Sequence, residues 1–322
     1  MPKFHLMSNL VVGLLLCSAG VGCTPAANGS AIDVYDGFET AGLSGVWDTD
    51  RFEPGAVTMQ TNIVRAGHGA AKITVHPRDK FEAGSPGSSG SERDELREAK
   101  KLTSKENIPY EFSFSMFFPT NFPVVPTRLV IAQWKQYCAD GGNCSDDSPV
   151  LAVRYIAGEL RITQDLDKKF IMLYQETNEF RGRWLDFKFQ VRFSPKENGR
   201  IKAWLGGRQL VDYRGITADS ENAETGYPSP SHFYFKMGLY RNVMPEPMTV
   251  YIDEYRKKEL PDVSFLTYHR PPGIVSRGIF AVIGNKNAPL ESAERDVLKS
   301  RAITCPWTSG HWWKPPCFSS ST

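Results

Sequence analysis

The chain has 322 residues, of which 41% are hydrophobic and 23% charged, a composition typical of a globular protein with a sizeable core. Its 38 basic and 36 acidic residues give a net charge of +2, which argues against non-specific nucleic-acid binding because such binding needs a clear cationic surplus. Aromatic residues make up 12% of the chain, a content that suits either stacking on sugar rings or a β-sheet core.

The first 23 residues are typical of an export signal, with a short polar start, an apolar run at 10–16 and small residues up to Cys23. The run is too short to span a bilayer, which needs about 20 apolar residues. The Val-Gly-Cys triplet ending at Cys23 resembles a bacterial lipobox with Cys23 as the lipidated residue, although Gly20 departs from the usual pattern. The alternative is ordinary cleavage and a soluble product. We therefore expect an exported protein, either secreted, periplasmic or an outer-membrane lipoprotein, with residues 24–31 as a polar tether.

Cysteine usage also favours an exported protein. Besides the two cysteines of the signal segment, the chain contains two close pairs, Cys138 with Cys144 and Cys305 with Cys317. The loop between the first two is short enough to close as a disulfide. Zinc is the rival interpretation, but no histidine stands at ligand spacing beside either pair. We predict two disulfides.

Residues 32–260 are predicted to form one all-β domain, because short segments with alternating apolar and polar residues are separated by Gly, Pro, Asn and Asp. The expected strands are 70–75, 93–98, 110–118, 130–135, 151–156, 159–163, 184–193, 201–205, 208–212, 234–240 and 248–255. Ala157-Gly158 and Gly206-Gly207 have the composition of hairpin turns. No segment shows sustained helical periodicity. We predict a β-jelly-roll sandwich of two antiparallel sheets with a concave substrate cleft.

Two segments depart from this pattern. Residues 83–91 are rich in Ser and Gly and are predicted to form a loop, either a lid over a cleft or a long connection. Residues 261–322 contain many prolines and scattered aromatics, which predicts an appendage with little regular structure apart from a short helix at 290–301.

Three of the predicted strands carry an apolar face and a face of long polar side chains. If these polar faces share one sheet, they line a cleft suited to an anionic, hydroxyl-rich polymer, because Arg pairs with carboxylates and Gln and Tyr bind hydroxyls. Each motif alone is weak, and their combination carries the prediction. The polar residues are Arg93, Glu95 and Arg97, then Gln133 and Lys135, then Tyr234, Lys236 and Tyr240.

In this order the motifs resemble those of family 7 alginate lyases: Arg-x-Glu-Leu-Arg-Glu from Arg93, Gln-x-Lys from Gln133 in place of Gln-x-His, and Tyr-Phe-Lys-x-Gly-x-Tyr ending at Tyr240. Residues 34–255 are also similar to the wider group of heparin lyase I and glucuronan lyases. The resemblance implies a jelly roll whose concave sheet binds a uronate-containing polysaccharide and cleaves it by β-elimination.

Transferred position by position, the resemblance implies that Arg93 and Gln133 neutralise the carboxylate on C5 and that Tyr240 is the catalytic tyrosine. It implies substrate binding for the other members of the set, with Glu95 as an orienting partner; these are Arg97, Tyr234 and Lys236. Removing the C5 proton builds an enolate-like dianion, so fixed donors on the carboxylate stabilise the transition state more than the ground state.

One departure concerns the proton transfers. The family histidine two residues after the glutamine is Lys135 here, and lysine is a poor base at neutral pH unless its pKa is depressed. Lys135 is therefore a tuned base, a group that only neutralises the substrate, or a sign of lost activity; His232 is an alternative imidazole. We favour neutralisation by Lys135, with Tyr240 as both base and acid. A single group suits syn elimination, which predicts D-glucuronate or D-mannuronate polymers rather than L-guluronate.

Other functions stay open at this point. A glycoside hydrolase needs two carboxylates across the scissile bond, and neighbouring acids here alternate between strand faces. A non-catalytic carbohydrate-binding protein would use the same cleft without turnover. We expect a monomer that needs no cofactor. The wider lyase group suggests a structural calcium ion, but no ligand spacing singles out a site among the candidates Asp140, Asp146, Asp147 and Asp253.

Overall fold

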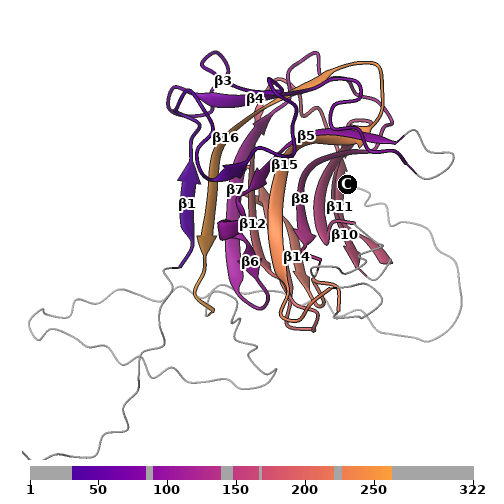
Figure 1. Cartoon of the computed structure of the whole chain (residues 1–322). Helices are drawn as coiled ribbons and strands as arrows, with labels where there is room; N and C mark the ends of the chain where they lie inside the picture. The colour runs from indigo at the N-terminus through magenta and orange to yellow at the C-terminus, as the bar shows by residue number, and fades with distance from the viewer. Residues whose placement is uncertain (1–30, 85–89, 139–147, 167–168, 221–226, 263–322) are drawn as a thin grey trace, which may run out of the picture. The chain divides into compact units, whose positions relative to one another are not determined.

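The computed structural model describes residues 31–84, 90–138, 148–166, 169–220 and 227–262. They form two antiparallel sheets packed face to face, with one short 3₁₀ helix, η1 (Lys100–Leu102) (Figure 1). No helix in this part of the chain is long and apolar enough to cross a membrane. The predicted signal segment, lipidation site and C-terminal disulfide, and all but the first two residues of the appendage, lie outside the described residues.

The first sheet, called sheet A, contains eight strands. Seven of them are neighbours in one continuous order, and the eighth, β1 (Asp33–Asp36), pairs with β16 (Met248–Glu259) outside this order. The order is β14 (Arg208–Arg214), β13 (Arg200–Leu205), β12 (Trp184–Arg192), β7 (Pro109–Phe117), β16 (Met248–Glu259), β4 (Ala70–Val75) and β3 (Val57–Gln60).

The second sheet, called sheet B, also contains eight strands. Its long strands are curved (Figure 1). The short strand β6 (Ser104–Lys105) pairs with β15 (His232–Asn242) outside the main order. That order is β11 (Lys169–Thr177), β10 (Glu159–Leu166), β9 (Leu151–Ile156), β8 (Leu129–Gln136), β15 (His232–Asn242), β5 (Ser91–Glu98) and β2 (Trp47–Asp48).

The core lies between the sheets and is built from the apolar faces of alternating strands. Phe235 of β15 is at its centre, with ring centroids 5.5 Å from Phe112, 4.8 Å from Trp134 and 5.7 Å from Tyr255. Burying an aromatic side chain of this size stabilises a fold by about 1.5–3 kcal/mol relative to leaving it in water. Successive side chains of a strand point to opposite faces, so packing Phe235 inward fixes the neighbouring polar residues on the outer face of sheet B.

The predicted all-β sandwich of two antiparallel sheets is confirmed, and each expected strand is present. Both predicted hairpins are formed: Ala157 and Gly158 have φ of 53° and 84°, and Gly206 and Gly207 have 55° and 82°, as two-residue turns require. Strands β1, β2, β3, β6 and β11 were not predicted. Of the predicted Ser/Gly loop, residues 85–89 lie outside the described part, and Ser91 already belongs to β5.

Candidate active site

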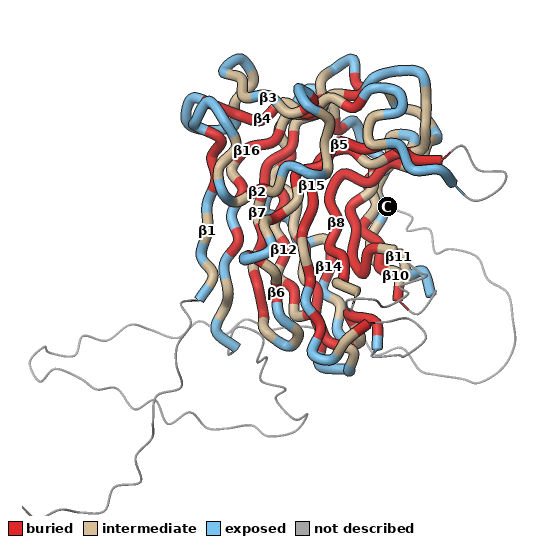
Figure 2. Tube along the Cα trace, viewed as in Figure 1, coloured by how far each residue is buried: buried red, intermediate tan, exposed pale blue. Residues whose placement is uncertain are grey.

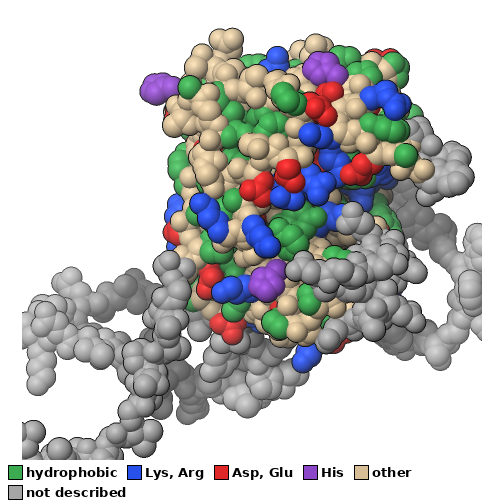
Figure 3. Space-filling model, in the orientation of Figure 1, with side chains coloured by type: hydrophobic (Ala, Val, Ile, Leu, Met, Phe, Trp, Pro, Cys, Tyr) green, Lys and Arg blue, Asp and Glu red, His purple; other side chains and the backbone are tan. Residues whose placement is uncertain are grey.

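The three strands with long polar faces are neighbours in sheet B, in the order β8, β15, β5. Their register places Lys236 between Gln133 and Arg97, and Tyr240 beside Arg93. Charged side chains of both signs gather over these strands (Figure 3). The polar faces therefore share one sheet, as the sequence predicts.

Gly238 allows β15 to approach β5 at the middle of this site. Its φ is +140°, and a Cβ atom at this position would lie 2.4 Å from the carbonyl oxygen of Asp94 and 2.9 Å from Cα of Glu95. Any side chain here would push the two strands apart. The glycine in the Tyr-Phe-Lys-x-Gly-x-Tyr motif is thus required by the close pairing that positions Tyr240 opposite Arg93.

Glu95 connects the other members of the site. One carboxylate oxygen accepts a hydrogen bond from Nε2 of Gln133, and the other accepts from Nζ of Lys236 at 2.9 Å and lies 3.6 Å from a terminal nitrogen of Arg93. Only 1% of the residue is exposed. Both oxygens of Glu95 thus hold neighbouring site residues, a geometry that fits the orienting role, and its predicted part in substrate binding stays a prediction.

Opposite charges compensate for burial in this network. Burial alone would raise the pKa of Glu95, but the charges of Lys236 and Arg93 and the hydrogen bonds offset it and hold that pKa below its usual value. Burial, assisted by the charges of Arg93 and Lys135, lowers the pKa of Lys236 to about 8 although Glu95 opposes this. At neutral pH the carboxylate of Glu95 is therefore ionised and lies next to the cationic groups of Lys236 and Arg93. Strands β5, β8 and β15 are buried along most of their length despite their polar residues (Figure 2).

Tyr240 lies among cations. The guanidinium carbon of Arg93 is 4.1 Å from the centroid of the Tyr240 ring, and that of Arg128 is 4.3 Å from it. Nζ of Lys236 lies 5.9 Å from the same centroid. Arg93 itself is paired with the carboxylate of Glu82. Positive charge at these distances attracts both the ring face and any anion formed beside it.

The remaining predicted residues surround this centre. Arg97 is paired with Asp48 at 2.9 Å and with Asp50 at 3.2 Å, so its guanidinium is already held by carboxylates. Tyr234 packs against Tyr137, with ring centroids 4.5 Å apart. Arg97 and Tyr234 lie on the outer face of sheet B, as the strand alternation predicts. Lys135, which is buried, and His232, which is exposed at the start of β15, lie on the same face.

Sequence reasoning missed two arginines on the same face, Arg128 and Arg154. Arg154 stands on the polar side of β9, where Leu151 and Val153 point into the core, so alternation in that strand was a usable signal. No such signal was present for Arg128, because this residue precedes β8 and the pairing of β8 with its neighbours shifts register near Val130. A β-bulge of this kind redirects side chains in a way that alternation does not reveal.

Predictions about metal and disulfide sites are only partly covered. Asp253 accepts backbone N–H groups of Arg65, Ala66 and Glu254, so both of its oxygens take part in hydrogen bonds, and calcium binding there stays a prediction. No cluster of metal-ligating side chains occurs within the described ranges, and the other candidate aspartates lie outside them. Cys138 is disulfide-bonded, but its predicted partner Cys144 also lies outside, so that pairing stays a prediction.

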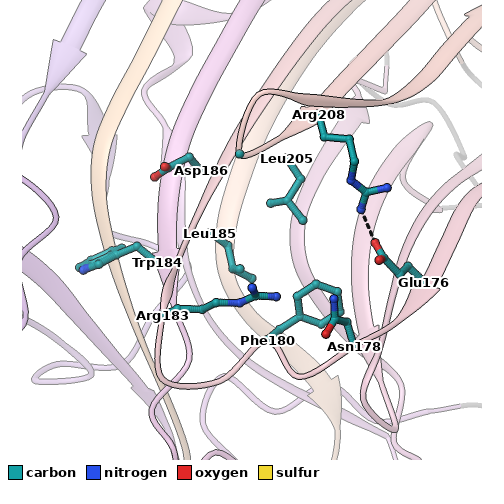
Figure 4. Close-up of a pocket in the computed structure, with 10 residues that line it drawn as sticks. Glu176, Asn178, Phe180, Arg183, Trp184, Leu185, Asp186, Leu205 and Arg208 are labelled. Carbon is teal, nitrogen blue, oxygen red and sulfur yellow. Dashed lines mark hydrogen bonds and ion pairs between the residues drawn. The ribbon is translucent and has the colours of Figure 1, made fainter.

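A separate pocket of about 380 Å³ opens where β11 and β12 meet the turn between β13 and β14 (Figure 4). It is lined by residues such as Asn178, Arg183 and Trp184, and its Arg208 is paired with Glu176. None of the predicted site residues lines it. We therefore place the candidate active site on the outer face of sheet B rather than in this pocket.

Asp94, on the opposite side of β5 from Arg93 and Glu95, gives a prediction about stability. Burial, together with the carboxyls of Asp79 and Glu53, raises its pKa to about 8 from 3.8, against the hydrogen bond from the backbone N–H of Glu53. Between these values the folded chain keeps a proton that the unfolded chain has lost. The free energy of unfolding should therefore fall as pH rises, by about 1.4 kcal/mol per pH unit.

Urea unfolding of the wild type and Asp94→Asn at several pH values between 5 and about 8 measures this effect. Asn copies the protonated acid, so the variant should lack this slope and exceed the wild type in stability at the upper end. Equal slopes in the two proteins would contradict the prediction.

Comparison with known proteins connects this geometry to a family. Residues 35–256 match the family model described as polysaccharide lyase. Among solved structures, an endo-β-1,4-glucuronan lyase from the fungus Trichoderma reesei superposes with a TM-score of 0.55 at 18% identity, covering 70% of this chain and 95% of that one. An alginate lyase from Corynebacterium sp. gives 0.42 at 20% identity, covering 63% and 81%. At 18% identity the likeness to the glucuronan lyase shows the fold alone. The TM-score of 0.42 for the alginate lyase is too low to support an argument. No curated protein matches.

Proposed function

Since the chain belongs to the polysaccharide lyase family, we propose that it cleaves a polymer of D-glucuronate or D-mannuronate by syn β-elimination. The observation that supports this most is the position of Tyr240. Its phenol ring lies between the guanidinium groups of Arg93 and Arg128. Nearby, Glu95 holds the amide of Gln133 and the ammonium of Lys236. A cationic cluster with one proton-transfer group is what elimination next to a carboxylate needs.

In this proposal Arg93 and Gln133 hold the C5 carboxylate of the sugar that loses its proton. The amide nitrogen of Gln133 carries two hydrogens, of which Glu95 takes one, so a second is available to a ligand. Arg93 has further donors besides those directed at Glu82 and Glu95. Negative charge moves onto the carboxylate as the C5–H bond breaks, and fixed donors stabilise it without reorganisation.

Tyr240 performs both proton transfers. Its phenolate takes the C5 proton, the C4–O bond breaks to give a C4=C5 double bond, and the phenol returns the proton to the leaving glycosidic oxygen. In D-glucuronate and D-mannuronate the C5 hydrogen and the C4 oxygen lie on the same side of the ring, so one group reaches both. Lys135, on β8 next to Tyr234, adds positive charge near the carboxylate and takes no proton.

A panel of polymers tests this assignment by the ultraviolet absorbance of the unsaturated product. We expect the full-length protein to cleave glucuronan or polymannuronate at least about tenfold faster than polyguluronate, a difference of about 1.4 kcal/mol in activation free energy. Lys135→Ala should lower activity less than removal of the Tyr240 hydroxyl. Rapid cleavage of polyguluronate alone would overturn syn elimination, and retention on a polyuronate without cleavage would point to a binding protein.

A further inference from the structure

Arg128 and Arg154 form a second cationic group beside the proposed centre. Nε of Arg128 donates to the side-chain oxygen of Asn242 at 2.9 Å, and Nε of Arg154 donates to the hydroxyl of Thr163 at 3.1 Å. Both guanidinium groups are thus fixed by neutral partners. Their remaining nitrogens have donors left for a ligand.

Neither arginine has a carboxylate partner within the described residues. Arg93, Arg97 and Lys236 are each in an ion pair, whereas among the described residues no carboxylate forms one with Arg128 or Arg154. Burial, and then the charge of Arg128, lower the pKa of Arg154, while the charge of Asp165 raises it. Two like charges held together in a half-buried place are unfavourable unless an anion joins them.

The register aligns this pair with the proposed catalytic group. Arg93 is opposite Tyr240, Tyr240 is opposite Val130, and Val130 is opposite Arg154, which gives a row across β5, β15, β8 and β9. Arg128 is in contact with the Tyr240 ring within this row. A polymer that crosses the strands along the row would meet Arg93 on one side of Tyr240 and the arginine pair on the other.

We propose that Arg128 and Arg154 bind the carboxylate of a second uronate, next along the polymer to the one held by Arg93 and Gln133. This inference rests on the proposed function and makes it narrower, since the enzyme then requires two consecutive uronates. Guanidinium groups suit this role because they pair with a carboxylate through two parallel hydrogen bonds. A polymer in which uronates alternate with neutral sugars would leave the pair unoccupied.

Steady-state kinetics of the full-length protein on glucuronan, and on glucuronan with part of its carboxyl groups reduced to alcohols, test this proposal. Arg128→Gln and Arg154→Gln should each raise KM on the fully charged polymer by about ten- to a hundredfold, with a smaller change in kcat. Arg154→Lys should recover part of the loss. Partial reduction should raise KM for the wild type more than for either variant. Arg256→Gln, on β16 and paired with Asp33 at 3.0 Å, is the matched control and should behave as wild type.

The outcomes separate this inference from the function on which it rests. If the wild type cleaves no polyuronate, the proposed function fails and the second uronate site falls with it. If the wild type cleaves glucuronan while both glutamine variants keep its KM, only the second site is overturned. A fall in kcat at unchanged KM would assign the arginines to positioning Tyr240 and would also overturn it. Thermal unfolding of each variant shows whether a change reflects loss of folded protein.

Discussion

Tyr240→Phe should reduce kcat by about 10²–10⁴-fold on the polymer that the wild type cleaves best, the range expected for loss of a general acid–base group. Phe keeps the ring that lies between Arg93 and Arg128, so the side chain should stay in place and only the hydroxyl is lost. Because one group performs both transfers in the proposed mechanism, no other residue replaces either step. Substrate binding should change little, so KM should stay within a small factor.

The measurement is the initial rate of ultraviolet absorbance increase at saturating polymer. Tyr251→Phe is a matched control, because it deletes a phenol hydroxyl from β16 of sheet A, where the ring packs 6.1 Å from Phe117. That variant should keep the wild-type rate. A wild-type rate in Tyr240→Phe would exclude the tyrosine as base and acid. Loss of activity in Lys135→Ala alone would assign the base to the lysine.

Local patterning predicted the fold well because most strands have one buried face. In 234–240 the apolar residues alternate with polar ones, and Phe235, Met237 and Leu239 are fully buried in the structure. The edge strand β11 escaped because its run Phe-Ile-Met-Leu-Tyr does not alternate, and most of its residues are half-buried at most. Alternation reports burial on one face, and an edge strand buried on neither face lacks that signal.

The site was predictable as a set of side chains but not as a network. Alternation placed Glu95 with Arg93, yet it did not show that Glu95 would be covered by Gln133 and Lys236 from two other strands. The pairing of Arg97 with Asp48 likewise depends on β2 lying beside β5. Such contacts follow from strand order, which the sequence pattern of one segment does not specify.

The burial of Glu95 predicts a large loss of stability in Glu95→Gln. The substitution keeps the shape and removes the charge that compensates Lys236, which is 2% exposed, and Arg93. Breaking a buried ion pair by removing one partner typically costs about 3–5 kcal/mol, because an uncompensated charge is left behind. Activity should fall as well, since Gln133 loses the carboxylate that orients its amide.

Glu111→Gln is the control for this prediction. Glu111 is half-buried on β7 and also accepts a hydrogen bond from a glutamine, Gln190 Nε2 at 2.9 Å, but it forms no ion pair with a described residue. Its replacement should cost no more than about 1 kcal/mol. Urea unfolding of the two variants and the wild type at pH 7 measures the difference, and equal losses would show that Glu95 stabilises the fold no more than an ordinary acceptor.

The pH dependence should identify the cause of the Glu95→Gln loss. In the wild type the lowered pKa of Glu95 contributes stability at pH values above 4.5, its pKa in the unfolded chain. This contribution disappears as pH falls through the pKa of the folded state. The variant has no carboxyl group at this position, so it should lack this loss of stability at acid pH. Lys236 affects the free energy of unfolding at alkaline pH. Its pKa is about 8 when folded and 10.5 when unfolded, so the free energy of unfolding rises with pH between these values. Without Glu95 this window should begin at lower pH, and the deficit should shrink as the lysine loses its proton.

Adding Lys236→Met to Glu95→Gln removes the unpaired cation and should recover part of the lost stability, because an apolar group of similar length needs no counter-ion. The double-mutant cycle should then give a coupling of about 0.5–3 kcal/mol between the two positions. Activity should stay low in the double variant, since the ammonium and the oriented amide are both missing. Recovered stability without recovered activity would separate the two roles of Glu95, as the counter-ion of a buried cation and as the group that orients the donors around Tyr240. Additive losses would show instead that the two residues act independently.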